Sequence, residues 1–272
     1  MCDVCTKFEL LVKASSATED DITGNNSHRE EVKACRDEKN RDKKLDPKTN
    51  SVFVVDVEKV LPIPKLNNSI PYYLQKIQLK NYSSFDLLNK DVLCYLIQEI
   101  EGGSDASVYA TLFMDLIEQK KSRTPTIRDF SIWSDTYDYA DAIRQARLDE
   151  AHGGKPGSKA YEVQIVSHTK FMNFEKCQYY SAIRPGQRAG DPTVNKLRVL
   201  KYTPDGMISY KLSFLEDEWQ QMGHRLASPY VEITPKYQEK LPLSSSKYRD
   251  MIKMKAFVPT SYHTLYEQLP HT

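Results

Sequence analysis

With 272 residues, the chain is long enough for one large hydrophobic core or two small ones, and its formal net charge at pH 7 is +1. Hydrophobic residues make up 40% and charged residues 28%, which is the balance of an ordinary soluble protein. The near-neutral charge excludes a chain-wide electrostatic attraction to nucleic acid or to an anionic membrane, so a basic binding surface has to be local.

The N-terminal segment, residues 1–50, is mostly polar and carries a pair of cysteines. Residues 1–13 predict a short helix or turn that holds Cys2 and Cys5. A loop is expected next, and HREEVKACRDEKNRDKK then predicts an exposed helix rich in opposite charges. The turn signal DPKTN separates this segment from the first strand.

The best-patterned part of the chain, residues 51–175, predicts strands and helices in alternation. Strands are expected in SVFVVDV, in YYLQKIQLKNYSSFDLL, in VLCYLIQE, in DFSIWSD and in AYEVQIV. ASVYATLFMDLIEQKK predicts an amphipathic helix with Ser104 or Asp105 as its N-cap, and TYDYADAIRQARLDEA predicts a second helix. The first three strands suit an antiparallel meander, which the later strands would join through helical crossovers.

The C-terminal extension, residues 176–272, has a looser pattern. LRVLKYTPDGMISYKLSF predicts a hairpin around PDG, and the stretch from Ile233 predicts extended chain followed by a short helix. The basic stretches KNRDKK, IRPGQRAGDPTVNKLR and KYRDMIKMK offer contacts to phosphates, with ordinary surface charge as the alternative. The candidate nucleic-acid-binding residues are Arg184, Arg188 and Arg198.

Two observations indicate the compartment. No apolar run is long enough to span a bilayer, and MCDVCTKFEL does not have the pattern of a signal peptide. The five cysteines are an odd number, which suits a reducing environment. We therefore expect an intracellular protein, in the cytosol or the nucleus, without a membrane partner.

An acid interrupts the apolar run of the first strand. Asp56 directly follows Val52, Phe53, Val54 and Val55, a composition typical of a buried strand. A carboxylate in such a place is costly unless it is hydrogen-bonded, paired or bound to a metal. Two interpretations stay open: Asp56 caps a turn at the end of the strand, or it is a metal ligand.

Several stretches are similar to a known group of proteins: VVDVEKVLPIPKL, PYYLQKIQLKNY, EGGSDASVYATLFMDLIEQ and LPLSSSKYRDMIKMKAFVPTSYHTLYEQLPH. In this order they resemble transposon-derived proteins that are abundant in invertebrate genomes and poorly characterised. The similarity covers most of residues 51–135 and 160–272, and MCDVC resembles a Cys-pair segment that precedes the core in that group. The group in turn resembles the ribonuclease-H-like cores of DDE-type transposases.

This resemblance implies an α+β or α/β fold, a mixed sheet with flanking helices. It also implies a site in which one Asp lies in the first strand, a second lies at the end of the fourth, and a third carboxylate comes later. Such acids hold two Mg²⁺ or Mn²⁺ ions for the cleavage or transfer of DNA strands. Asp56 and Asp135 occupy the first two places.

The chain departs from the group after Asp135. It continues directly into TYDYADAIRQARLDE, which resembles a segment found much later in the group. The departure implies an internal deletion that truncates the core and removes the third acid. Substitutes are available in Asp138, Asp141, Asp149, Glu150 and Glu175, for which a solvated surface is the alternative interpretation.

We therefore expect a transposase-derived protein without efficient catalysis that binds nucleic acid, namely DNA, or another protein. The alternative is a residual Mg²⁺- or Mn²⁺-dependent nuclease or strand transferase. A structural zinc site is a further prediction, because Cys2, Cys5, His28 and Cys35 supply four thiolate or imidazole donors. Reduced thiols are the alternative there, and no other cofactor is expected.

Overall fold

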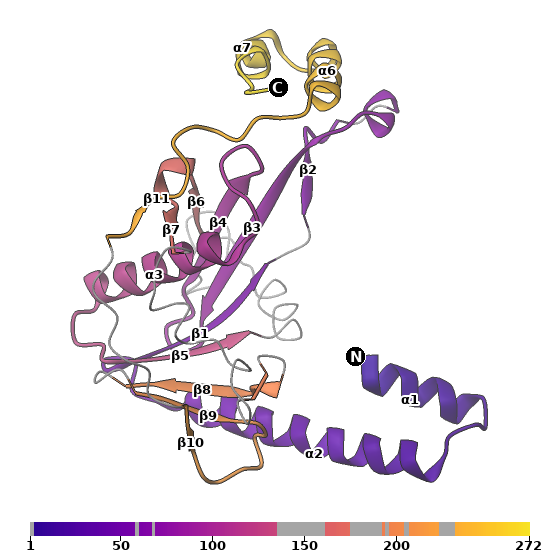
Figure 1. Cartoon of the computed structure of the whole chain (residues 1–272), viewed down its shortest axis with the longest axis vertical. Helices are drawn as coiled ribbons and strands as arrows, with labels where there is room; N and C mark the ends of the chain where they lie inside the picture. The colour runs from indigo at the N-terminus through magenta and orange to yellow at the C-terminus, as the bar shows by residue number, and fades with distance from the viewer. Residues whose placement is uncertain are drawn as a thin grey trace, which may run out of the picture. The chain divides into compact units, whose positions relative to one another are not determined.

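The computed structural model of the chain describes residues 3–57, 60–66, 69–134, 161–174, 192–193, 196–203, 207–222 and 232–272. The chain forms two compact units. The small unit comprises residues 1–45 and 177–231, and the main unit comprises residues 46–176 and 232–272. Figure 1 shows the elements of both units. Among the described residues, no helix combines the length and the apolar character needed to cross a membrane.

The described residues of the small unit form two helices and a three-stranded antiparallel sheet with the strand order β10-β9-β8. The bounds are α1 (Asp3–Lys13), α2 (Glu19–Asp42), β8 (Val199–Tyr202), β9 (Ile208–Lys211) and β10 (Gln220–Gln221). Of the two alternatives expected for residues 1–13, a short helix or a turn, the structure has the helix α1, and the predicted hairpin is confirmed by the pairing of β8 with β9. Residues 204–206, the PDG turn itself, lie outside the described residues.

Helix α2 begins earlier than predicted. The loop expected before His28 is wrong over residues 19–27, because the helix already begins at Glu19. Thr18 and Asp21 form a capping box: Thr18 Oγ1 accepts from the amide of Asp21 at 3.2 Å, and Asp21 Oδ2 accepts from the amide of Thr18 at 3.0 Å. Hydrogen bonds from Thr18 also lower the pKa of Asp21. This cap starts the helix ahead of residues with weak helix propensity.

The main unit is built on a mixed sheet with the strand order β5-β1-β3-β4-β6. The bounds are β1 (Asn50–Val57), β3 (Ile77–Asp86), β4 (Val92–Gln98), β5 (Asp129–Ser134) and β6 (Glu162–Ile165). Strands β1, β3 and β4 form the predicted antiparallel meander. Strand β5 lies parallel to β1, and β6 lies parallel to β4 at the opposite edge. The α/β class is therefore confirmed.

The described residues of the main unit also form a long helix and several short elements. They are β2 (Leu61–Ile63), η1 (Ile70–Tyr73), α3 (Ala106–Arg123), η3 (His168–Lys170), β7 (Met172–Asn173), β11 (Thr234–Pro235), α6 (Ser245–Met254), η5 (Lys255–Phe257), η6 (Thr260–Tyr262) and α7 (His263–Glu267). The short C-terminal helix predicted from sequence is confirmed as α6. The second predicted helix, TYDYADAIRQARLDEA, lies outside the described residues.

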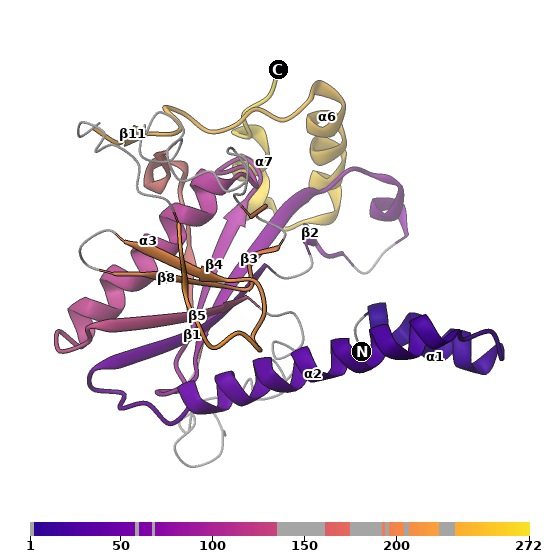
Figure 2. The same ribbon diagram turned by 60° about the horizontal axis from the view of Figure 1, so that its bottom comes forward.

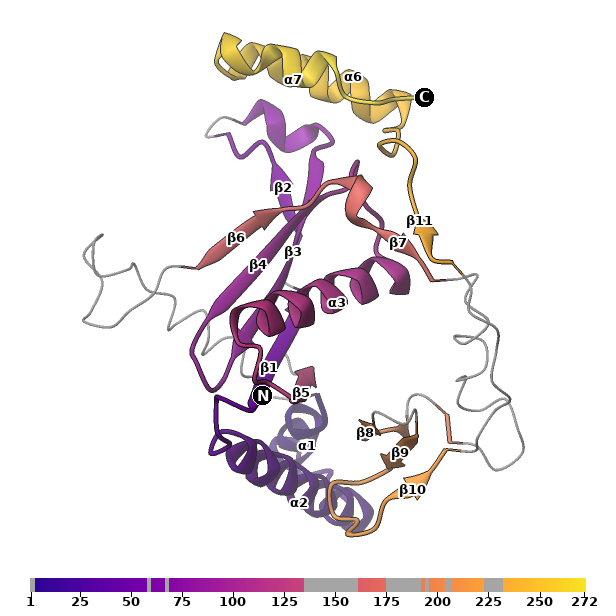
Figure 3. The same cartoon turned by 90° about the vertical axis from the view of Figure 1, so that its left-hand side faces the viewer.

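Helix α3 covers one face of the sheet, as Figure 3 shows. Asp105 is its N-cap and accepts hydrogen bonds from the amides of Ser107 and Val108, at 3.0 and 3.3 Å, as the sequence allowed. The largest hydrophobic cluster lies between the helix and the sheet; its fully buried members include Tyr95, Leu112 and Phe171. The helix therefore forms the crossover connection from β4 to β5.

Two further clusters extend the core. On the face away from α3, Val52 and Val54 pack with Leu87 and with the half-buried Trp133. At the far end of the long strands, the C-terminal helices pack against β3 and the β4–α3 connection (Figure 2). That cluster comprises Ile77, Ile100, Leu243, Met251, Met254 and Leu269. The C-terminal segment is thus part of the main unit.

The ring of Phe171 lies so close to the backbone of Gly102 that a larger residue does not fit there. A Cβ at this position would lie 2.7 Å from Cε2 of Phe171, whose side chain is fully buried. We expect Gly102→Ala to lower the free energy of unfolding by about 1–2 kcal/mol, measured by urea unfolding followed by circular dichroism. Gly24→Ala, in the helix α2, is the control. A Cβ added there would have no atom within 4 Å apart from its own stretch of helix backbone, so the alanine should raise the free energy of unfolding by about 0.5–1 kcal/mol. Equal effects at both positions would contradict the steric argument.

Candidate functional site

Asp56 lies near the end of β1, on the sheet face away from α3. Its side chain is half-buried, and its Oδ1 accepts a hydrogen bond from the amide of Val57 at 2.8 Å. The antiparallel neighbour β3 places Ser83 opposite it. The alternation of side chains along a strand puts Asp56 on the same face as Val52 and Val54. Asp56 is therefore an acid at the edge of an apolar cluster.

The parallel neighbour of β1 is the strand that leads to the second predicted acid. The β1–β5 ladder pairs Val54 with Trp133 and ends at the pair of Val55 and Ser134. These last two residues directly precede Asp56 and Asp135 in the sequence. Asp135 itself lies outside the described residues, as do the substitute acids from Asp138 to Glu175.

The predicted zinc ligands lie on the two helices of the small unit. Cys5 is on α1, and His28 and Cys35 are on α2, whereas Cys2 lies outside the described residues. Within the part of the chain that the structure describes, no three His, Cys, Asp or Glu side chains form a group that could hold a metal ion. Because Cys2 and Asp135 are not among those residues, the zinc site and the Mg²⁺ or Mn²⁺ site stay predictions.

One of the three candidate arginines is described. Arg198 directly precedes β8, and its amide donates a hydrogen bond to the carbonyl of Lys211 at 3.0 Å. It therefore belongs to the three-stranded sheet of the small unit. Arg184 and Arg188 lie outside the described residues.

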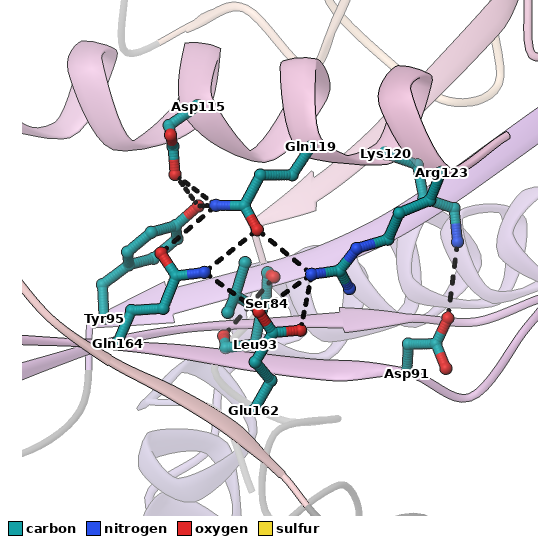
Figure 4. Close-up of polar contacts among 10 residues, drawn as sticks. All are labelled: Ser84, Asp91, Leu93, Tyr95, Asp115, Gln119, Lys120, Arg123, Glu162 and Gln164. Carbon is teal, nitrogen blue, oxygen red and sulfur yellow. Dashed lines mark hydrogen bonds and ion pairs between the residues drawn. The ribbon is translucent and has the colours of Figure 1, made fainter. Parts of the chain in front are cut away.

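A polar network that we did not predict connects α3 with the sheet (Figure 4). The hydroxyl of the buried Tyr95 donates to Asp115 Oδ2 at 2.6 Å, and Lys170 Nζ lies 2.8 Å from Asp115 Oδ1. Burial and the hydrogen bond to Asp115 raise the pKa of Tyr95. Burial alone would raise the pKa of Asp115, but the hydrogen bonds from Lys170, Tyr95 and Gln119 outweigh it and lower the pKa. Asp115 is thus a charged acceptor with several donors.

The network continues to the edge strand β6. Gln119 and Gln164 pair through their amides: Gln119 Nε2 lies 3.2 Å from Gln164 Oε1, and Gln164 Nε2 lies 3.0 Å from Gln119 Oε1. Arg123 reaches Glu162 at 2.7 Å, although both side chains are well exposed. Such an exposed pair adds little stability, so the amide pair of Gln119 and Gln164 makes the main polar connection to β6.

A second cluster surrounds EGGSD, residues 101–105, the loop that precedes α3. Glu101 accepts from the amide of His168 at 2.8 Å and pairs with Lys240 Nζ at 2.8 Å. Burial opposes ionisation of Glu101, but Lys240 and His168 together lower its pKa. Lys80 Nζ donates to the carbonyls of Gly102 and Gly103 at 3.3 and 2.9 Å. The two acids of this loop, Glu101 and Asp105, are paired with lysines from the C-terminal segment, an arrangement that suits a structural connection.

The unpredicted networks left only a weak signal in the sequence. Asp115, Gln119 and Arg123 are spaced by four residues, which places them on one side of a helix. Their partners Tyr95 and Gln164 lie on two other elements, and the strand pairing that brings them together is not local. The helix spacing predicts a polar stripe, but it does not identify what the stripe contacts.

Comparisons with protein-family models, with curated proteins and with solved structures find no match to this chain. Function is therefore inferred from the strand arrangement and from the side chains described above. The β1–β5 ladder ends at Val55 and Ser134, the two residues that directly precede the predicted acids in the sequence. We assign the contacts of the EGGSD loop and of the α3 network to the stability of the main unit.

Proposed function

We propose that the chain is a transposase-derived protein with a ribonuclease-H-like core that binds nucleic acid without cleaving it efficiently. The strand arrangement supports this proposal. An antiparallel meander is followed by a helical crossover, and the next long strand, β5, lies parallel to the first. The resemblance requires its first two acids in the first and the fourth strand. In this sheet those strands are neighbours.

The register of the ladder is the observation that carries the proposal. Val55 and Ser134 are paired, and each directly precedes one of the two predicted acids, Asp56 and Asp135, in the sequence. Paired residues of parallel strands point to the same face, and neighbouring strands lie about 4.8 Å apart. Two carboxylates at that spacing suit one hard cation such as Mg²⁺ or Mn²⁺.

Efficient cleavage needs more than this pair. Two-metal chemistry holds two cations a few ångströms apart, and this requires further oxygen ligands. The third acid expected from the resemblance belongs to the segment that is missing after Asp135. Phosphate binding depends on other side chains, so loss of that acid leaves binding in place.

Binding and cleavage are separated by one experiment on the full chain. We expect duplex DNA to bind with an affinity that falls as salt rises, while supercoiled plasmid stays intact with Mg²⁺ or Mn²⁺. Asp56→Asn should leave DNA binding unchanged, whereas removal of charge at Arg184, Arg188 and Arg198 should weaken it. Mn²⁺ should raise the melting temperature of the wild type but not that of Asp56→Asn.

Asp129→Asn is the matched control, because it removes an acid from the other end of the same strand pair. It should keep the response to Mn²⁺. Metal-dependent nicking that Asp56→Asn abolishes would favour the second candidate, a residual nuclease or strand transferase. Absence of DNA binding at low salt would overturn the proposal.

A further inference from the structure

The three-stranded sheet of the small unit carries an exposed indole that two lysines contact. Trp219 lies just before β10, and its side chain is 40% exposed. Lys211 Nζ lies 4.9 Å from the centroid of the indole ring, and Lys201 Nζ lies 5.7 Å from it. Both distances are within the range of cation–π contacts.

The strand register places these side chains on one face. Lys201 on β8 pairs with Ser209 on β9, and Ser209 lies two residues before Lys211. Ser209 also pairs with Gln221 on β10, which lies two residues after Trp219. Because side chains two residues apart in a strand share a face, the sheet presents a row of basic and aromatic groups.

The two lysines differ in their surroundings. Lys211 is half-buried and donates to the carbonyl of Glu216 at 2.8 Å, so it braces the β9–β10 connection. Lys201 is exposed, and its ammonium group lies over the indole ring of Trp219. Arg198, a predicted phosphate contact, directly precedes the same strand. The cations therefore lie on the strands β8 and β9.

Acidic side chains precede the indole in the β9–β10 connection. Asp217 and Glu218 are exposed and directly precede Trp219, whereas the carboxylate of Glu216 accepts from the amide of Leu212 at 3.2 Å. These acids disfavour a phosphate at the β9–β10 connection. An anionic ligand stacked on Trp219 would therefore direct its phosphate toward Lys201.

We propose that Trp219, Lys201 and Lys211 form a stacking site for single-stranded nucleic acid. A base packs on the exposed indole, and the adjoining phosphate accepts from the lysine ammonium groups. Unpaired bases offer the π-face that this contact needs, and a duplex keeps that face covered. The proposal rests on the proposed function and assigns nucleic-acid binding to a specific surface.

The chain provides its own probe, since it contains only two tryptophans. Trp133→Phe leaves Trp219 as the only indole of the full chain. We expect its fluorescence to be quenched by oligo(dT) and oligo(U) of about 12 nucleotides, a length within the usual site sizes. The midpoint should match that of binding measured independently by anisotropy of a labelled oligonucleotide.

Substitutions then identify the contacts. Trp219→Ala should weaken oligo(dT) binding roughly 5- to 100-fold, and Trp219→Phe should lose less because it keeps an aromatic ring. Lys201→Gln should weaken binding and reduce the slope of log affinity against log salt by about 1. Asp217→Asn combined with Glu218→Gln should tighten binding.

The outcomes separate this inference from the proposed function. If anisotropy shows binding while Trp219 fluorescence and the Trp219→Ala affinity stay unchanged, the stacking site is wrong and the proposed function stands. Equal quenching by a duplex of the same length would overturn the preference for single strands. If neither single strands nor duplex bind at low salt, both proposals fail.

Discussion

Replacing Asp86 by alanine is expected to lower the free energy of unfolding of the main unit by about 3–5 kcal/mol. The Asp86 side chain is 1% exposed, and its Oδ2 lies 2.5 Å from Lys120 Nζ. It also accepts from Ser51 Oγ at 3.1 Å, from the amide of Leu88 at 2.9 Å and from Asn89 Nδ2 at 3.2 Å. The substitution leaves a buried ammonium group and several donors without this acceptor.

Asp91 provides the matched control. It pairs with the same lysine at 3.6 Å, but its side chain is 41% exposed, so Asp91→Ala should cost less than about 1 kcal/mol. Urea unfolding in a Trp219→Phe background reports on the main unit through Trp133, which lies on β5. Similar losses for Asp86→Ala and Asp91→Ala would contradict the role assigned to the buried pair.

The same pair gives a pH dependence. Burial alone would raise the pKa of Asp86, but the hydrogen bond and charge of Lys120 outweigh it and lower the pKa below its ordinary value. The stabilisation is therefore fully present above the ordinary Asp pKa of about 3.9 and is lost as the pH falls below it. Lowering the pH from 6 to 3 should destabilise the wild type more than Asp86→Ala.

The local patterns of the sequence were enough to predict most elements of the main sheet. The apolar runs predicted β1, β4 and β5, and the N-cap at Asp105 predicted the start of α3. These features depend on residues close together in the sequence. The early start of α2 was missed because its composition is polar, although Thr18 and Asp21 carry a capping signal.

Features that depend on pairing between distant strands could not be predicted in the same way. The sequence suggested that the last strand joins the sheet, but not that β6 would lie beside β4. Likewise, Asp86 and Lys120 are 34 residues apart, and nothing local indicates that they meet. The predicted acid Asp56 was visible because a charge interrupts an apolar run, whereas polar groups on a polar helix stripe give no such contrast.

The second large effect is expected at Asp115. Its side chain is 19% exposed, and its carboxylate accepts hydrogen bonds from Tyr95, Gln119 and Lys170. Asp115→Asn replaces this charged acceptor by an amide, which satisfies the three donors poorly. We expect a loss of about 2–3 kcal/mol at pH 7, measured by urea unfolding. Tyr95→Phe removes one of the three donors and should cost about 1 kcal/mol. The double variant should lose less than the sum, because both changes remove the same hydrogen bond.

The pH dependence of stability separates the contribution of the Asp115 charge from that of the packing of its side chain. Because the partners of Asp115 lower its pKa, its contribution is present above the ordinary Asp pKa of about 3.9 and is lost as the pH falls through the lowered value. A protonated aspartate resembles asparagine in size and hydrogen-bonding capacity. The stabilities of the wild type and Asp115→Asn should therefore converge as the pH is lowered from 7 to 3. A difference that stays constant over this range would show that α3 is held by the packing around Asp115, and that the carboxylate charge does not bind it to the sheet.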